Sequence, residues 1–378
     1  MITNVHIHTP WSFCELDSIE QIVRKASTEG IAALGINDAN TVEGYKDFSE
    51  SCTRERVYPL FNVEFAVDGE SIRRHNYSLN PRLTCIHGKA LKYPAGLCGD
   101  SRNMIASIWK ASQDRIWKMI DALNRLLQSR HFSITLDYNV IRSRYAKQSL
   151  LEPHLARALH SEFISTWSSN EECIAMFRRL FKDDSFNCDP SDAVCIRREI
   201  INRLMVVGKD AYISEQPQAH MDLSQAKQII LQAGGIPCYQ CTFNETPDSM
   251  INPEALANGL LEKNIHAIEF ISCHTSHATL STCMRYFADR HFCVTVGTGN
   301  GSDLKNSFIP LTSDGLPLDE QLTHISYNGA CILAAHQELH HQKRRGFVDE
   351  SGNRLVPPEQ LEGFIRIGDL AIRRSTTR

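Results

Sequence analysis

The chain has 378 residues, of which 42% are hydrophobic and 22% charged, and its formal net charge is −4. This much apolar sequence can bury the core of one large domain or two ordinary ones, and it excludes a disordered chain. The near-neutral charge gives no electrostatic reason to expect nucleic acid or an anionic membrane as a partner. Thirteen cysteines and sixteen histidines stand out. They can indicate disulfides, metal binding or neither.

The sequence shows no targeting or membrane segment. Its start lacks a basic region followed by an apolar run, and no window reaches the roughly 18 apolar residues of a membrane span. We therefore expect a cytoplasmic protein with reduced cysteines, most of them buried in the core. Cys238 and Cys241 have C-x-x-C spacing, but no second pair stands at the distance of a zinc knuckle. Ordinary buried thiols are the better interpretation of this pair.

The first 66 residues alternate between strand and helix patterns. Strand patterns occupy residues 3–8, 31–36 and 58–67, and helical spacing occupies residues 18–30 and 42–51. Repeated strand–helix units predict a parallel sheet with right-handed crossovers.

From about residue 100 to residue 215 the patterns are mainly helical, and strand-like alternation is scarce. The strand–helix alternation then resumes, with strands predicted at residues 236–241, 266–271 and 293–296. These patterns predict an α/β domain interrupted by a helical insertion. The predicted parts are the first half of the α/β domain at 1–99, the insertion at 100–215, the second half at 216–350, and a partly ordered tail at 351–378.

Polar side chains stand at the ends of at least five predicted strands. They are His6 and His8, Asn37 and Asp38, Glu64, Gln240 and Asn244, Glu269 and His274, and Thr298, Asn300 and Asp303. In parallel α/β barrels and sheets the chemistry lies at the carboxyl ends of the strands. We therefore expect these side chains to converge on one face.

The His-x-His motif of the first strand suggests a metal site. Side chains alternate along a strand, so His6 and His8 share a face and can bind one divalent cation. Glu64, at the end of a neighbouring strand, can complete or bridge such a site. Two surface histidines on an edge strand are the alternative.

These strand ends resemble a known family. His6-Ile-His8-Thr9-Pro-Trp-Ser12 is similar to the first motif of the PHP superfamily (polymerase and histidinol phosphatase domains). Gly35-Ile-Asn37-Asp38-Ala39-Asn40-Thr41 stands at the second motif, and Asn62-Val-Glu64-Phe65 matches the third. Further similarities, to a long bacterial branch, extend to about residue 350. The resemblance implies an α/β fold, a distorted (β/α)7 TIM-like barrel with a mainly helical insertion. Characterised members use two or three metal ions to hydrolyse phosphoesters.

The sequence departs from the family at several ligand positions. Ala39 stands where the second motif carries a histidine, and Cys14 lies near a further histidine position. Gly299 and Asn300 replace the acidic residue and the histidine of the last motif, and residues 240–244 lack the usual histidine or aspartate. Neutral amides are poor ligands for transition metals. The resemblance therefore implies fewer divalent ions (Zn, Mn or Fe) than in typical relatives. The expected metal ligands are His6, His8, Glu64 and Asp303.

Two functions of different class follow. One is a metal-dependent hydrolase, a phosphoesterase for a small phosphorylated or anionic metabolite, with a reduced metal site. In it Asp38 is a nearby ligand or general base, and Arg82 and Lys89 bind the substrate anion. The alternative is that Arg82 and Lys89 are ordinary surface cations without a role in binding. The other function is a catalytically inactive PHP-fold pseudoenzyme with a binding or assembly role. We expect no nucleic-acid or membrane partner, and a homo-oligomer stays open.

The remaining histidines and basic residues give weaker signals. His336, His340 and His341 follow helical spacing, and we interpret them as a solvated helix end. The basic run Lys343-Arg344-Arg345 is interpreted as a solvated turn at the carboxyl end of that helix.

Overall fold

The computed structural model describes residues 1–68, 83–94, 97–167, 169–216, 219–241, 252–299 and 307–377. The chain forms two compact units. The first comprises Met1–Thr9, Leu16–Ile105 and His220–Arg378, and the second comprises Pro10–Glu15 and Ala106–Ala219. Each unit contains a hydrophobic core of its own.

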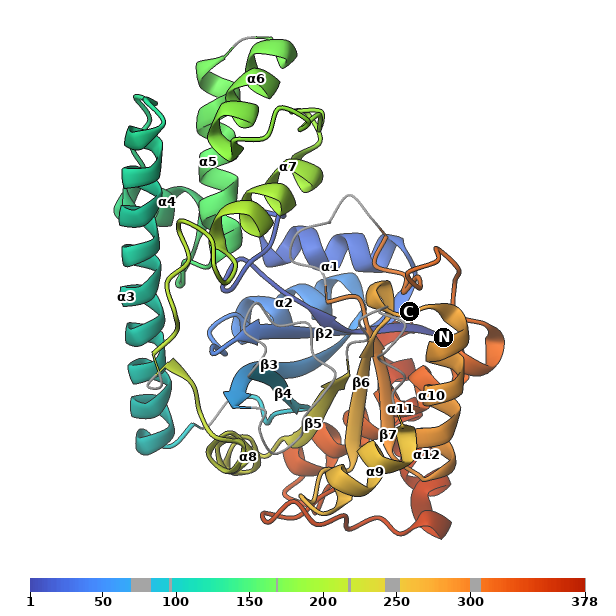
Figure 1. The fold of residues 1–378 in the computed structure, drawn as a ribbon. Helices are drawn as coiled ribbons and strands as arrows, with labels where there is room; N and C mark the ends of the chain where they lie inside the picture. The colour runs from blue at the N-terminus through green and yellow to red at the C-terminus, as the bar shows by residue number, and fades with distance from the viewer. Residues whose placement is uncertain are drawn as a thin grey trace. The chain divides into compact units, whose positions relative to one another are not determined.

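Seven strands form the sheet of the first unit, and they neighbour one another in chain order. They are β1 (Ile2–Ile7), β2 (Ile31–Ala39), β3 (Tyr58–Asp68), β4 (Leu83–Lys89), β5 (Ile236–Cys241), β6 (Ala267–Ile271) and β7 (Cys293–Gly297). Gly299 N donates to His6 O, so the end of β7 meets β1 and the sheet nearly closes into a barrel (Figure 1). The predicted α/β barrel with a helical insertion is confirmed.

One strand runs against the others. β1, β2 and β3 are parallel to one another, as are β5, β6 and β7, whereas β4 pairs antiparallel with both β3 and β5. The parallel pairing predicted from the strand–helix units is confirmed within β1–β3 and within β5–β7, and β4 is an antiparallel strand that the sequence did not predict. The sequence pattern missed this strand because its residues from Ile86 to Lys89 are buried whether apolar or polar, which hides the usual alternation.

Helices surround the barrel of the first unit. They are α1 (Ile19–Thr28), α2 (Tyr45–Glu55), α8 (Leu223–Gln232), α9 (Pro253–Leu261), α10 (His277–Asp289), α11 (Glu320–His341) and α12 (Leu361–Thr376), with short 3-10 helices at Ser272–His274 and Pro358–Gln360. Helix α1 shows why they form. Ser18 caps its first turn by accepting from Gln21 N, and its buried residues follow the spacing of one helical face.

The partly ordered tail predicted for residues 351–378 is wrong. Helix α12 packs on α11, and its buried side chains, Phe364, Ala371 and Ile372, lie on one face. At Gly368 a Cβ atom would lie 1.8 Å from Cys331 O, so only glycine permits this close approach of the two helices. The basic residues at the end of the chain obscured this amphipathic pattern in the sequence.

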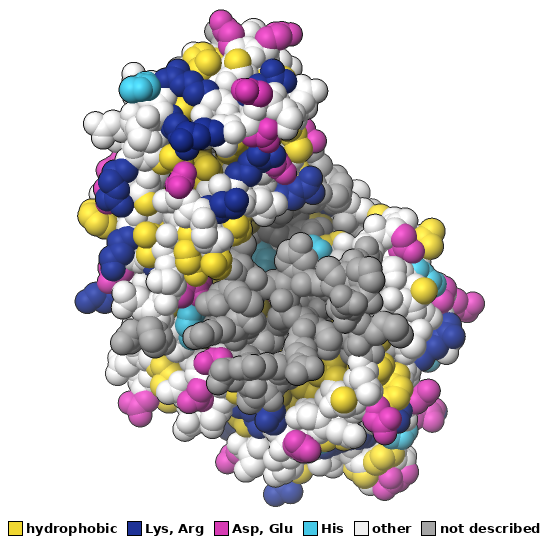
Figure 2. All heavy atoms as spheres, viewed as in Figure 1, with side chains coloured by type: hydrophobic (Ala, Val, Ile, Leu, Met, Phe, Trp, Pro, Cys, Tyr) yellow, Lys and Arg dark blue, Asp and Glu magenta, His cyan; other side chains and the backbone are white. Residues whose placement is uncertain are grey.

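The second unit is helical. Most of α3 (Gly99–Ser129) belongs to it, with α4 (Tyr138–Tyr145), α5 (Glu152–Thr166), α6 (Asn170–Phe181), α7 (Ala193–Ile200) and a π-helix at Ile201–Met205. Phe163 and Phe177 stack in its core with ring centroids 4.5 Å apart. Lys and Arg side chains are frequent over α5 to α7, with Asp and Glu among them (Figure 2). This mixture is typical of a solvated surface.

The state of the cysteines and the hydropathy of the helices were both predicted from the sequence. Cys188 and Cys195 form a disulfide, so the expectation that every cysteine is reduced is wrong for this pair. The chain between them folds back and brings the two Cα atoms within 6.7 Å. Cys238 and Cys241 are buried free thiols, as expected. No helix in the described part of the chain combines the length and hydropathy that a membrane crossing requires.

Candidate metal centre

Side chains alternate between the two faces of each strand, and several inward positions of this barrel carry buried polar residues. On β1, Asn4 and His6 point inward, and Asn4 Nδ2 donates to Thr298 Oγ1. Two glycines leave room for the inward side chains. A Cβ at Gly297 would lie 2.2 Å from His6 Cβ, and one at Gly35 would lie 2.4 Å from Asn62 Nδ2.

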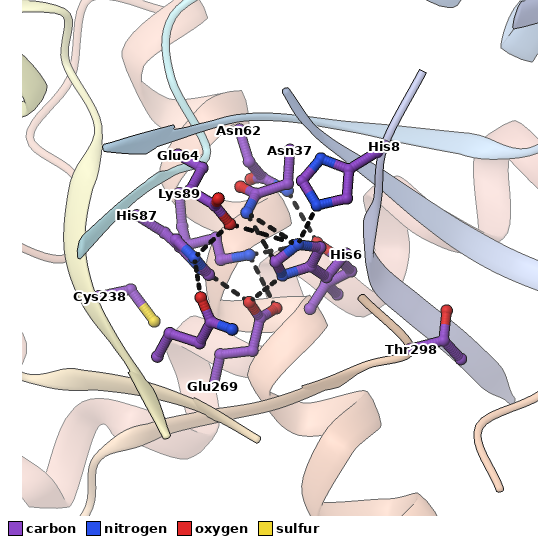
Figure 3. Close-up of polar contacts among 12 residues, drawn as sticks. His6, His8, Asn37, Asn62, Glu64, His87, Lys89, Cys238, Glu269 and Thr298 are labelled. Carbon is purple, nitrogen blue, oxygen red and sulfur yellow. Dashed lines mark hydrogen bonds and ion pairs between the residues drawn. The ribbon is translucent and has the colours of Figure 1, made fainter. Parts of the chain in front are cut away.

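Four side chains form the centre of this interior, two imidazoles between two carboxylates (Figure 3). Glu269 Oε2 lies 2.7 Å from His6 Nδ1 and 2.8 Å from His87 Nδ1. Glu64 Oε2 lies 3.6 Å from His6 Nε2 and 3.2 Å from His87 Nε2. Each imidazole therefore has one nitrogen toward Glu269 and the other toward Glu64.

Glu269 is fully buried and is compensated by a buried cation. Its Oε1 accepts from Lys89 Nζ at 2.7 Å, and Lys89 also donates to Val5 O at 3.2 Å. Burial alone would raise the pKa of Glu269. The charges of Lys89 and His6 and the hydrogen bond from His6 outweigh burial and hold this pKa well below its ordinary value. Glu269 is thus a fixed negative charge behind both rings.

The environment of His6 selects one tautomer. Burial is the largest influence and lowers the pKa of His6 to about 4, although Glu269 acts in the opposite direction. The neutral ring donates its Nδ1 proton to Glu269. Its Nε2 therefore carries a lone pair, which faces Glu64 and lies 3.3 Å from Asn37 Nδ2. This is the state in which a histidine binds a metal ion.

His87 and Glu64 form the other half of the centre. Burial and Lys89 would lower the pKa of His87, but Glu269 and Glu64 outweigh them and raise it. Its Nδ1 meets Glu269 as an ion pair rather than as an aligned hydrogen bond. For Glu64, burial would raise the pKa, and the hydrogen bond from His87 and the other histidines lower it to about 2. Glu64 is therefore an anion.

The donor set fits a divalent metal ion. One ligand atom each from His6, Glu64 and His87 lie within 4.8 Å of one another. Two imidazoles and one carboxylate suit Zn²⁺, Fe²⁺ or Mn²⁺. Asn37 Oδ1 is buried and has no hydrogen-bond partner among the described residues, which leaves an acceptor unsatisfied beside the group. The Glu64 side chain is 18% exposed, so this corner can be reached from solvent.

The structure places the predicted site residues in different surroundings. His6 and Glu64 belong to the group, and His8 lies at its edge with its Nε2 3.3 Å from His6 Nε2. Asp38 accepts from Thr9 N at 2.7 Å and from Thr9 Oγ1 at 2.6 Å, so it holds the chain just after β1.

Lys89 is completely buried in its ion pair with Glu269, so it is not a surface cation. The other predicted candidates Arg82, Asn244, Asn300 and Asp303 lie outside the described residues.

Sequence reasoning missed the roles of His87 and Glu269. Glu269 stood among the predicted strand-end residues without a function, and His87 was not placed on any strand. The signal for His87 was present, because His87 and Lys89 are two residues apart and therefore share a face of β4. In the antiparallel pairing His87 lies directly opposite Glu64. Prediction of the site thus required recognition of β4.

Comparison with known proteins gives a family match and partial relatives. A family model described as the PHP domain matches residues 4–187. DNA polymerase III subunit alpha from two strains of Staphylococcus epidermidis is 37% identical over 73 residues, which is 18% of this chain. The matched segment spans only 7% of the length of those polymerase subunits.

Two solved structures share the fold over most of the chain. An amidohydrolase from Chromobacterium violaceum, with bound sulfate and no metal, has a TM-score of 0.57 and 16% identity, and the match covers 86% of this chain and 97% of that one. A protein from Bifidobacterium adolescentis, provisionally assigned as a metal-dependent phosphoesterase, has a TM-score of 0.55 and 15% identity, with coverage of 85% and 94%. At such identities the likeness shows the fold alone.

Proposed function

We propose that this chain, which contains a PHP domain as its sequence motifs predicted, is a metal-dependent hydrolase of phosphate esters. The observation that carries this proposal is the group His6, Glu64 and His87, with Glu269 behind both imidazoles. The names of the two structural relatives, an amidohydrolase and a phosphoesterase, support a hydrolase of this fold.

In this proposal His6 Nε2, His87 Nε2 and one oxygen of Glu64 hold the ion, and His8 is a further ligand at the edge of the group. Bound Zn²⁺, Mn²⁺ or Fe²⁺ would supply a Lewis acid and lower the pKa of a coordinated water. Glu269 holds His6 in the ligating tautomer and orients His87.

The other polar residues support this arrangement. Lys89 neutralises the buried charge of Glu269, and it therefore acts in this proposal through that carboxylate rather than on the substrate. Asp38 holds Thr9 through both of its oxygens and fixes the backbone that carries His8. We assign to Asp38 this positioning role in place of general base.

A reduced site is the finer part of the proposal. Ala39 offers no ligand at the end of β2, where the second motif of the family has a histidine. At the end of β5, Gln240 meets His87 through its Oε1 at 2.9 Å, which is a neutral amide contact. Both features support fewer ions than in typical relatives. The substrate we propose is a small phosphorylated metabolite.

Metal analysis and turnover test the proposal together. Protein stripped with EDTA is dialysed against Zn²⁺, Mn²⁺ or Fe²⁺, and bound metal and hydrolysis of p-nitrophenyl phosphate and its diester are measured. We expect bound metal and metal-dependent turnover in the wild type. The double variant His6→Ala/His87→Ala should retain less than about 0.1 ion per chain and no turnover.

A matched control is His324→Ala/His341→Ala, which removes two histidines of α11 that lie outside the metal centre and should behave as the wild type. If the wild type binds no more metal and hydrolyses no faster than His6→Ala/His87→Ala, the hydrolase proposal fails. The inactive pseudoenzyme would then be the better description.

A further inference from the structure

A cavity lies at the opposite end of β5 from the metal centre. It has a volume of about 540 Å³ and is lined by Gly234 and Gly235, by His336 and His340 near the end of α11, and by residues of the segment 343–351. Gly235 directly precedes β5, whereas Gln240 near the other end of that strand contacts His87. The length of β5 separates the two places by roughly 17 Å.

The wall of this cavity is rigidly built around His336. The side chain of His336 is 1% exposed, and it donates through Nε2 to Gly234 O at 2.8 Å and accepts at Nδ1 from Phe347 N at 2.9 Å. A Cβ at Gly346 would lie 2.3 Å from His336 Nδ1, so the chain passes directly over the imidazole. The contacts of Gly346 and Phe347 fix the end of the segment that carries Lys343, Arg344 and Arg345. Its start is fixed by Arg344 N, which donates to Leu339 O of α11. His336 is therefore not part of the solvated helix end predicted from the sequence.

Three adjacent and exposed cations line the cavity, together with two carboxylates. Within the described part of the chain, neither Lys343 nor Arg344 nor Arg345 forms an ion pair. Of the two carboxylates in the lining, Asp349 accepts hydrogen bonds from the backbone and side chain of its own turn, at Ser351 and Asn353. Glu350 is exposed. The lining therefore combines three cations with two carboxylates, and the cations lie next to the carboxyl end of α11.

We propose that this cavity binds a small anion that carries two linked phosphate groups. Arginine binds phosphate oxygens in a bidentate manner, so Arg344 and Arg345 can each bind one phosphate group, with Lys343 as a further charged donor. The volume lies in the range of small-molecule sites. Because the cavity lies at the amino-terminal end of a barrel strand, where these folds do not carry out catalysis, the anion acts as an effector and not as the substrate.

Calorimetric titration tests this proposal with pyrophosphate and ADP as probes, in EDTA so that the metal centre holds no ion. We expect both probes to bind the wild type. Arg344→Gln/Arg345→Gln should weaken binding about tenfold or more, since both substitutions remove charge-assisted hydrogen bonds to phosphate. Glu350→Gln should tighten binding, because it removes a like charge from the lining.

The matched control is Arg366→Gln/Arg373→Gln, which removes the same charge from α12, where both arginines pair within the helix. Equal affinity of ADP and pyrophosphate supports a site for the diphosphate alone, and tighter binding of ADP supports a nucleotide. The proposal is overturned if neither probe binds, if both double variants lose affinity equally, or if a single-stranded oligonucleotide binds more tightly than ADP. Unchanged thermal midpoints of the variants confirm that they fold.

Discussion

Glu269 joins three functional side chains of the barrel interior. One of its oxygens lies within 2.8 Å of both His6 Nδ1 and His87 Nδ1, and the other accepts from Lys89. A carboxylate behind a ligating histidine fixes the tautomer and orientation of the ring and raises its basicity. Here a single carboxylate does this for two rings, so its loss affects both ligands together.

Glu269→Gln should therefore weaken metal binding. The substitution keeps the shape of the side chain and removes its charge, and we expect the affinity for Zn²⁺ to fall about 10–100-fold. Competition with a chromophoric chelator measures this affinity. Glu262→Gln, at the exposed end of α9, is the control and should leave it unchanged. An affinity equal to that of the wild type in Glu269→Gln would show that the carboxylate does not support the ligands.

Lys89→Met should destabilise the fold. It leaves the carboxylate of Glu269 buried without its cation, and loss of one partner of a buried pair costs about 3–5 kcal/mol of unfolding free energy. The double variant Lys89→Met/Glu269→Gln removes both charges and should recover most of this loss. Urea unfolding in EDTA measures the wild type and both variants. If the double variant is no more stable than Lys89→Met, the unpaired charge of Glu269 is not the cause of the lost stability.

Buried neutral histidines make the protein sensitive to acid. Burial is the largest influence on His336 and His154, and it lowers the pKa of His336 to about 3 and that of His154 to about 4. The unfolded chain takes up these protons near pH 6.5, and the folded chain does not. Their stabilisation is therefore fully present above pH 6.5 and decreases as the pH falls toward 4.

We expect the urea midpoint to decrease from pH 7 to pH 4.5, with each histidine contributing up to about 1.4 kcal/mol per pH unit. His336→Gln is less stable at pH 7, because two hydrogen bonds change, but its midpoint should depend less on pH. A wild-type midpoint that is flat over this window would contradict the assignment.

Among the elements, α12 depends on one glycine. A Cβ at Gly368 would lie 1.8 Å from Cys331 O of α11, so Gly368→Ala must push the helices apart, and we expect it to cost about 1–3 kcal/mol. At Gly363, on the same helix, an added Cβ would meet no atom within 4 Å, and Gly363→Ala should be neutral or stabilising by about 0.5–1 kcal/mol. Urea unfolding measures the free energy of unfolding of Gly368→Ala and Gly363→Ala. Equal stability of the two variants would mean that α12 is not packed through Gly368.

Element patterns explain what the sequence could predict and what it could not. The strands carrying His6, Glu64 and Glu269 alternate or form apolar runs, so their ends could be aligned as the ends of a parallel barrel. His87 could not be aligned in this way, because β4 runs antiparallel to β3. The rule that functional residues stand at the carboxyl ends of parallel strands therefore does not apply to β4. Long-range pairing, such as that of Glu269 with Lys89, has no local pattern at all.

The whole molecule should respond to metal in only one of its two units. The second unit has a separate core, and the proposed ligands all lie in the first. A ligand stabilises the folded unit that binds it, by about 2.7 kcal/mol at a hundred times its Kd. Hydrogen exchange with mass spectrometry, with and without Zn²⁺, should therefore show slower exchange in β1 to β7 and no change in α5 to α7. Equal protection of both units would contradict this assignment.

The contact between His6 and Glu269 also sets an order of events during synthesis. The two residues are 263 positions apart, and at about 5–20 residues per second a ribosome needs roughly 13 to 53 seconds to pass from one to the other. During that interval β1 can pair with β2 but lacks Glu269 and β7, while the helical unit, complete by Ala219, can already fold. His6 therefore lacks its buried partner Glu269, and the barrel lacks its last strand β7, until the last third of the chain has been translated.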